Sequence, residues 1–233
     1  MIGRSNPLNK AQVWLEKTLQ YQFQDVDLFK RALTHRSASN KNNERLEFLG
    51  DAVLDFIASE IVYKVRPNAS EGDLSRLRAS LVKDETLAAL AIEIGLGEHL
   101  ILGIGELKTG GNRRDSILAD SLEAIFGAVF LDQGFEAAKD LINRAYADRF
   151  LKLPNVVDLK DSKTRLQEWL QERKMALPNY ELTNVSGKDH EQRFIVTCMV
   201  TDRQVSTHGE STTRRKAEQK AAQKMTELLI EQK

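Results

Sequence analysis

Acidic side chains recur at helical spacing inside apolar segments of the first half of the chain. In NERLEFLGDAVL, Glu44, Glu47 and Asp51 occupy positions i, i+3 and i+7, so a helix would place them on one face. In DSILADSLEAIF, Asp120 and Glu123 repeat the i, i+3 spacing. Each such pair repels by about 0.2–0.5 kcal/mol on an isolated helix. Another interaction should therefore offset the repulsion.

Two helices that each project carboxylates from a mainly apolar surface predict one shared centre. All-oxygen donor sets favour Mg²⁺ or Mn²⁺, and Mg²⁺ usually binds substrate phosphates as well. One or two such ions can activate water and stabilise the leaving oxygen in phosphodiester hydrolysis. The spacing leaves alternatives open, because each acid could instead cap a helix, pair with a base or face solvent. Glu71, in EGDLSRLRASL, equally suits the start of a helix.

The elements that carry these acids predict an all-α domain over residues 1–152. Apolar residues recur near a 3.6-residue period, and segments rich in Gly and Pro separate the periods. The segments predicted to be helical are AQVWLEKTL, VDLFKRALTH, ERLEFLGDAVLDFIASEIVYKV, EGDLSRLRASLVKDETLAALAIEIG, DSILADSLEAIFGAVFLDQG and FEAAKDLINRAYADRF. The Gly-rich, basic segment GELKTGGNRRD predicts a loop near the acids whose Arg113 and Arg114 touch a nucleic acid.

A second, smaller α+β domain is predicted over residues 162–233. Residues 153–161 lack clear periodicity and carry a proline, which is typical of a linker. SKTRLQEWLQERK then predicts a helix, and YELTNVSG, RFIVTCMVTD and RQVSTHG predict strands. A long helix follows, capped near Thr212 or Thr213. The order α-β-β-β-α therefore replaces the all-helical pattern.

Composition excludes little by itself. The 233 residues contain 34 Lys and Arg against 34 Asp and Glu, so the formal net charge is zero. A local basic face can still bind nucleic acid. The single cysteine, Cys198, excludes an internal disulfide or a cysteine-rich zinc site. Neither a signal peptide nor an apolar run of about 18 residues is present, which predicts a soluble cytoplasmic protein.

The motifs together resemble bacterial ribonuclease III over almost the whole chain. The matching segments are LTHRSAS, NERLEFLGDAVL, EGDLSRLRASLV, GELKTGGNRRDSILADSLEAIFGAVFLD and the tail TRLQEW…GKDHEQRF…STTRRKAEQKAA. The resemblance implies a helical, homodimeric endonuclease domain that uses Mg²⁺, for which Mn²⁺ can substitute. It also implies cleavage of double-stranded RNA to 5′-phosphate and 3′-hydroxyl ends. The implied substrates are ribosomal RNA precursors and structured messenger RNAs.

The resemblance also assigns roles to the acids. It implies the metal ligands Glu47, Asp51, Asp120 and Glu123. Of these, Asp51 and Glu123 would be catalytic, Glu47 and Glu123 would bind the ion that positions the attacking water, and Glu123 would be the most essential. Glu44 and Glu71 would engage the RNA at the cut site, although helix capping or solvation also explains them.

Phe48 and His35 lie near the acids in the sequence, and a separate role is predicted for each. Phe48 matches the family position that inserts into the partner subunit, but the sequence equally allows a core aromatic. His35, in LTHRSAS, is predicted to hold the loop before the acidic helix and to take no part in catalysis.

The tail resembles the double-stranded RNA-binding domain. The resemblance places Arg214, Arg215 and Lys216 on phosphates, and a helix N-terminus also favours phosphate. It places Thr164, Gln167 and Glu168 in one minor groove and His190 in the next. An ordinary solvated helix face and a plain loop histidine remain alternatives. Many such domains have a basic residue at the position of Glu218, so this departure should weaken the phosphate contacts.

Three classes of function were weighed from these features. The first is a Mg²⁺-dependent endoribonuclease specific for double-stranded RNA. The second is a protein that binds double-stranded RNA without cutting it, or a ribosome-assembly factor. The third is another metal-dependent phosphohydrolase. The acidic cluster argues against the second class, because acids repel phosphates and pure binding does not need them. The basic tail argues against the third.

Overall fold

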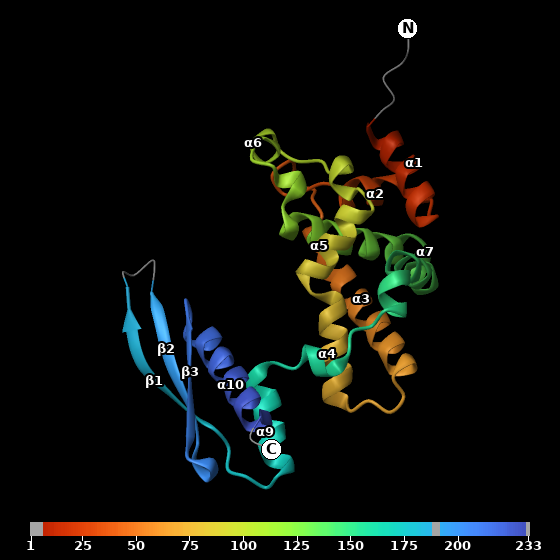
Figure 1. Ribbon diagram of the computed structural model, residues 1–233. Coiled ribbons are helices and arrows are strands. Elements are labelled where there is room, and N and C mark those ends of the chain that lie inside the picture. The colour runs from red at the N-terminus through yellow and green to blue at the C-terminus, as the bar shows by residue number, and fades with distance from the viewer. Residues whose placement is uncertain (1–6, 188–191, 232–233) are drawn as a thin grey trace. The chain divides into compact units, whose positions relative to one another are not determined.

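The computed structural model describes residues 7–187 and 192–231, and the chain divides into two compact units (Figure 1). The first unit spans Met1–Pro154 and the second Asn155–Lys233. His190 lies outside the described residues. Within the described residues no helix has the length and apolar character needed to cross a membrane.

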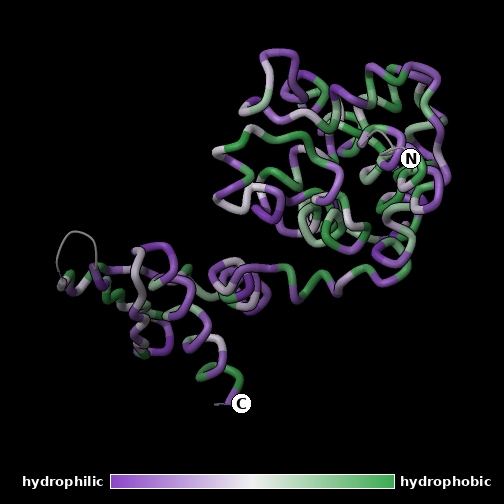
Figure 2. Tube along the Cα trace, turned by 90° about the horizontal axis from the view of Figure 1, so that it is seen from above, coloured by the Kyte–Doolittle hydropathy of each residue, from purple (hydrophilic) through white to green (hydrophobic). Residues whose placement is uncertain are grey.

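The first unit is all-α, which confirms the predicted class. Short 3-10 turns at Leu96–His99 and Gly111–Arg113 connect longer helices. These helices are α1 (Pro7–Leu19), α2 (Val26–Ala32), α3 (Glu44–Val65), α4 (Glu71–Val82), α5 (Asp84–Glu93), α6 (Ile104–Lys108) and α7 (Asp115–Leu151). Figure 2 shows green and purple alternating along the helices, as expected when each helix buries one face.

Three local features differ from the predicted helices. The continuous helix expected over 71–95 is broken at Lys83, whose extended backbone (ψ 150°) ends α4 and starts α5. The two last predicted segments join into α7, which is kinked at Gly134, where the positive φ of 84° favours glycine. The first four residues of the predicted loop GELKTGGNRRD belong to the short helix α6, which begins at Ile104.

The centre of the first unit is the close packing of α3 against α7. A Cβ atom on Gly50 would lie 1.8 Å from the carbonyl oxygen of Glu123. A Cβ on Gly127 would lie 2.2 Å from the carbonyl oxygen of Leu46. Two glycines in helix interiors are thus explained by the reciprocal approach of two backbones. Because Gly50 adjoins Asp51 and approaches Glu123, this crossing brings the two acidic segments together.

The second unit is an antiparallel three-stranded sheet with helices on one face, which confirms the predicted α+β class and α-β-β-β-α order. Its elements are α8 (Val156–Leu159), α9 (Ser162–Glu172), β1 (Asn179–Ser186), β2 (Arg193–Val200), β3 (Val205–Ser211) and α10 (Arg214–Glu231). The strands lie in the order β1-β2-β3, and Figure 1 shows α9 and α10 on the same side of them. The short helix α8 lies inside the segment expected to be a linker.

Alternation along the strands builds the core of the second unit. Apolar side chains on one face of β2 and β3 meet α9 and α10. The fully or nearly buried members are Leu166, Leu170, Cys198, Val200, Ala221, Ala222, Met225 and Leu229. A Cβ on Gly209 would lie 2.1 Å from the carbonyl oxygen of Ala217, so α10 approaches β3 closely. The amide of Lys216 donates to Thr213 Oγ1 at 3.3 Å, which confirms the predicted N-cap.

Candidate active site and RNA-binding surface

The acids of α3 lie in its first two turns, directly after a buried asparagine. Asn43 precedes the helix, and its amide donates to the Thr34 carbonyl at 2.9 Å. This contact fixes where α3 begins, and the helical period then places Glu44, Glu47 and Asp51 on one face. The early position suits carboxylates, because the helix dipole is positive at this end.

Glu123, on α7, is the electrostatic centre of the acids. Its pKa is raised to about 8, mainly by burial and then by the charges of Asp51, Glu47, Asp120 and Asp84, in that order. The two acids from α3 therefore act on Glu123 together with its own-helix neighbour Asp120. The four carboxylates predicted as metal ligands share one electrostatic environment.

The remaining acids of this set have raised pKa values for the same reasons. Burial is the main cause at Glu47, followed by the charges of Asp120 and Glu44. Burial is again the main cause at Asp120, with Asp84 next. At Asp51, burial is followed by the charge of Asp55. Such coupled, partly buried carboxylates are typical of functional sites.

A pocket of about 490 Å³ opens beside Glu47 and Asp120. It is lined by His35, Arg36, Ser37, Asn43, Glu44, Glu47, Glu106, Arg114, Ser116, Ile117 and Asp120. Arg36 Nη1 lies 3.6 Å from Glu44 Oε1, and its positive charge partly opposes the rise in the pKa values of Glu47 and Asp120. Arg114 pairs with Glu106 at 2.8 Å. The pocket thus combines acids with cations that can contact a phosphate.

His35 has the geometry of a loop support. The amide of Ser37 donates to His35 Nδ1 at 3.2 Å, and the amide of Gly103 donates to Ser37 Oγ at 3.0 Å. A Cβ on Gly103 would lie 2.3 Å from the Ser37 carbonyl oxygen. The two loops that border the pocket are therefore held against each other.

Glu71 is not among the acids whose charges act most strongly on Glu123, whereas two acids that the sequence reasoning did not identify act on the cluster. Glu71 accepts a hydrogen bond from Ser75 Oγ at 2.8 Å at the start of α4, and its charge is not a main cause of the raised pKa values. Asp55 and Asp84 act on the cluster but were missed by the sequence reasoning. Asp55 continues the stripe four residues after Asp51, so spacing could have found it. Asp84 comes from α5, which only tertiary packing brings close.

A ready-made metal site is not part of this arrangement. Within residues 7–187 and 192–231, no group of three or more His, Cys, Asp or Glu side chains is arranged to hold a metal ion. The donor chemistry nevertheless fits a hard divalent cation, because the cluster offers carboxylate oxygens that repel one another.

Phe48 points away from the core. Its side chain is 80% exposed, although it lies between Glu47 and the buried crossing of α3 with α7. The alternative of a core aromatic is therefore wrong. Phe56 and Tyr63 on the same helix are 60% and 70% exposed. Phe56 follows Phe48 by eight residues and Tyr63 follows Phe56 by seven, so the helical period places the three on one side of α3.

The residues predicted to bind RNA that the structure describes in the second unit lie in the first turn of α10 and in the first two turns of α9. Arg214, Arg215 and Lys216 are exposed in the first turn of α10. Gln167 is exposed on α9, and Thr164 is half-buried. Glu168 is partly buried and accepts a hydrogen bond from Lys160 Nζ at 2.6 Å.

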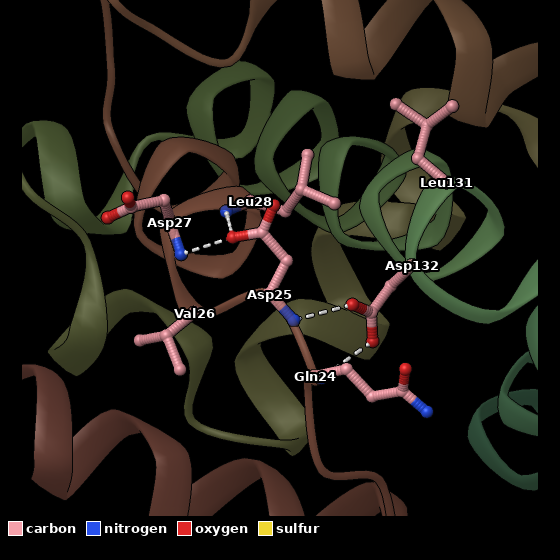
Figure 3. Close-up of a pocket in the computed structure, with 7 residues that line it drawn as sticks. All are labelled: Gln24, Asp25, Val26, Asp27, Leu28, Leu131 and Asp132. Atoms are coloured by element: carbon pink, nitrogen blue, oxygen red, sulfur yellow. Dashed lines mark hydrogen bonds between the residues drawn. The ribbon is translucent and has the colours of Figure 1, made fainter.

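A second pocket, lined by Asp25, Asp27 and Asp132, has a structural role. Figure 3 shows Asp132 accepting hydrogen bonds from the amides of Gln24 and Asp25, at 3.0 and 2.7 Å. The hydroxyl of Tyr21 also donates to Asp132, at 2.7 Å. Asp25 in turn caps α2 by accepting from the amides of Asp27 and Leu28. These carboxylates anchor the segment before α2 to α7.

A helical unit with converging carboxylates, followed by an α-β-β-β-α unit with a basic helix start, defines a nuclease with a nucleic-acid-binding domain. A family model described as Ribonuclease-III-like matches residues 25–150, and one described as double-stranded RNA binding motif matches residues 162–229. The chain belongs to the ribonuclease III family. It is an endoribonuclease that acts on double-stranded RNA.

Individual relatives agree with this assignment. Ribonuclease 3 of Nitrosococcus oceani is 52% identical over 216 residues, covering 92% of this chain and 93% of the relative. Ribonuclease 3 of Shewanella sp. strain ANA-3 is 50% identical over 213 residues, covering 91% and 94%. The solved nuclease domain of ribonuclease III from Campylobacter jejuni is 44% identical, with a TM-score of 0.58. It covers 60% of this chain and 98% of that one.

Proposed function

We propose that the chain hydrolyses double-stranded RNA in a Mg²⁺-dependent reaction at the carboxylates of α3 and α7, leaving 5′-phosphate and 3′-hydroxyl ends. The observation that carries this proposal is the convergence of the acids at the crossing of α3 and α7, where Gly50 closely approaches the Glu123 backbone and where burial and the charges of Asp51, Glu47 and Asp120 raise the pKa of Glu123 to about 8. A divalent cation among these groups would neutralise their repulsion and favour their ionised forms.

Each acid then has a distinct role. Glu47, Asp51, Asp120 and Glu123 would hold the cation, since carboxylate oxygens are the ligands that Mg²⁺ prefers and Mn²⁺ also accepts. When bound, the ion supplies a more acidic water and stabilises the leaving oxygen. Glu47 and Glu123 would bind the ion that positions the attacking water, and Asp51, like Glu123, would be catalytic. Asp120 completes the ligand set.

The outer acids and the pocket cations would handle the RNA strand. Glu44 lies beside Arg36 at the mouth of the pocket, so this pair can contact the backbone near the cut site. We place Glu71 in the same role on the resemblance alone. Arg114 also borders the pocket and could neutralise a phosphate there.

We further propose that the protein acts as a homodimer through the exposed side of α3. Phe48, Phe56 and Tyr63 form an apolar stripe there. Exposed apolar stripes of this kind commonly mark protein–protein contacts. The Campylobacter jejuni nuclease domain is described as having a region involved in dimer formation.

The second unit would supply affinity. Arg214, Arg215 and Lys216 would contact phosphates, while Thr164, Gln167 and Glu168 would reach a minor groove. We propose residues 1–152 as the catalytic domain, 153–161 as a linker and 162–233 as the RNA-binding domain. Structured precursors such as ribosomal RNA and folded messenger RNA are the expected substrates.

The deciding experiment follows an end-labelled RNA duplex of about 30 base pairs, long enough for the roughly 16 base pairs that one such domain spans. The native chain should cut with Mg²⁺ and not in EDTA. Glu123→Gln should lose cutting yet bind the duplex as the native chain does. If both proteins bind but neither cuts in Mg²⁺ or Mn²⁺, the acids are structural and the protein only binds RNA.

A further inference from the structure

Glu218 occupies an enclosed position on α10. Its side chain is only 13% exposed, although it lies one turn after the exposed basic start of the helix. One carboxylate oxygen accepts from Arg214 Nε at 3.0 Å and the other accepts from Lys163 Nζ at 2.7 Å. The same carboxylate thus joins a residue of its own helix to a residue of α9.

The α9 partner is itself held in place by α10 and by the sheet. The amide of Lys163 donates to Gln219 Oε1 at 3.1 Å. Its Nζ lies 4.4 Å from the centroid of the Tyr180 ring on β1, a cation–π contact. The starts of α9 and α10 are therefore connected by two neighbouring α10 side chains, Glu218 and Gln219.

The Glu218 carboxylate keeps its negative charge although it is largely enclosed. Burial alone would raise the pKa of Glu218, but the hydrogen bonds from Lys163 and Arg214 outweigh it, so the pKa is lowered. Enclosed ion pairs are costly to break from one side, because the remaining cation loses its partner. Removing the carboxylate would release both cations at once.

We propose that Glu218 is a positioning residue for RNA binding, which holds the start of α9 at a fixed place against the start of α10 and orients the Arg214 guanidinium. The inference rests on the proposed RNA-binding role of these two helix starts. Double-stranded RNA is recognised by shape, so the distance between minor-groove and phosphate contacts must be fixed.

The geometry of Arg214 fits this role. Glu218 takes the Nε hydrogen, and among the described residues no other partner is recorded for the two terminal nitrogens of Arg214. Those nitrogens can donate to a phosphate while Nε is held. An arginine fixed in this way loses less conformational entropy on binding than a free one.

The first test compares two variants that add the same charge to α10. If position 218 merely faced a phosphate, Glu218→Lys would tighten binding, since it replaces an acid with a base. We expect it to weaken binding of a 30-base-pair duplex in EDTA by about 10-fold, because two cations lose their partner. The matched control, Glu227→Lys, lies exposed near the other end of α10 and should change affinity less than about 2-fold. Binding by Glu218→Lys that is as tight as native binding, or tighter, would overturn the inference.

The second test separates positioning from folding. Glu218→Gln in the full chain should raise the RNA concentration at half-maximal cleavage by about 5-fold while leaving the rate at saturating RNA unchanged. In an Arg214→Ala background the same substitution should have a much smaller effect, because the oriented group is already absent. An equal effect in both backgrounds would refute positioning through Arg214. By contrast, a native chain that does not bind the duplex would refute the proposed function itself.

Discussion

Glu123 shows how one side chain acquires its chemistry from its neighbours. Its position on α7 is mostly buried, and each nearby charge that affects it strongly is also an acid. The result is a carboxyl group with a pKa near neutrality in the metal-free chain. Small changes in proton or cation concentration should therefore change its charge.

We predict that Glu123 makes the metal-free protein less stable as pH rises. Its pKa is raised from 4.5 to about 8, so between these values the folded chain holds a proton that the unfolded chain releases. The stability that this group contributes is therefore fully present below about pH 4.5 and is lost as pH rises toward 8. Glu123→Gln should exceed the native free energy of unfolding by about 1–2 kcal/mol at pH 8, after allowance for partial solvent screening.

Urea unfolding in EDTA at pH 5 and pH 8 measures this difference. The advantage of Glu123→Gln should be much smaller at pH 5, because pH 5 lies close to the unfolded-state pKa of 4.5 and little of the stability has yet been lost. A constant difference between the two proteins at both values of pH would show that Glu123 does not titrate in this range.

Asp84 gives a second prediction at the same scale. Because its negative charge helps to raise the pKa of Glu123, Asp84→Asn should lower that pKa. Carboxyl ¹³C chemical shifts followed by NMR in EDTA would measure it. Asp115→Asn, at the exposed start of α7, is the control and should leave the titration in place. An unchanged midpoint in Asp84→Asn would mean that solvent screens the interaction.

At the scale of elements, the crossing of α3 and α7 decides whether a site exists. Each helix supplies only two of the four predicted metal ligands. The glycine contacts at Gly50 and Gly127 allow the two backbones to approach. The loops that carry His35 and Gly103 then close the pocket beside the acids. The site is thus a consequence of helix packing rather than of any single motif.

We predict that Gly127→Ala destabilises this crossing by about 3 kcal/mol, because the added methyl would lie 2.2 Å from the Leu46 carbonyl oxygen. It should also reduce cleavage, since the acids would move apart. Gly105→Ala, where no atom lies within 4 Å of the new Cβ, should leave stability within about 0.5 kcal/mol of native. Thermal unfolding and cleavage rates report both effects, and similar behaviour of the two variants would contradict the close approach.

At the scale of the whole molecule, two units of different construction share the work. The helical unit holds the acids, and the α-β-β-β-α unit holds the exposed basic residues. Acids repel phosphates, so a nuclease gains from a separate source of affinity. Dimerisation through α3 would add a second acidic cluster to the same assembly.

We predict that residues 1–154 without the second unit remain folded and still cut RNA at low salt. Their helices form an independent core, and the division at Pro154 interrupts none of them. The RNA concentration required should rise, because the phosphate contacts of the second unit are lost. Cleavage titrations at several salt concentrations measure this. A folded, dimeric truncation that never cuts would contradict the division of work.

We also predict that Phe48→Glu dissociates the homodimer. The substitution places a charge where an 80% exposed aromatic side chain would be buried between subunits. Sedimentation should show a monomer, while circular dichroism should show native helix content. Ile104→Glu changes a similarly exposed residue on α6 and should leave the oligomeric state unchanged. A dimer that survives Phe48→Glu would place the interface elsewhere.

The sequence by itself determined the helical class of the first unit, the α-β-β-β-α order of the second and the resemblance to ribonuclease III. These features are local, since periodicity and capping signals such as Thr213 lie within a few residues of the structure they specify. The stripe of Glu44, Glu47 and Asp51 could be recognised from the sequence for the same reason. Local reading failed at Lys83, where the apolar period continues through an extended residue that breaks the helix.

Only the tertiary structure decided which acids interact and which charges are shared. Asp84 joins the electrostatic environment of Glu123 because α5 packs on α7, a contact that no local pattern encodes. Glu218 looked like a missing phosphate contact in sequence, yet its carboxylate is enclosed between Lys163 and Arg214. Phe48 is an apolar aromatic residue of the kind usually found in a core, but its side chain is 80% exposed. Burial and charge coupling depend on residues distant in sequence, so they appear only when the chain has folded.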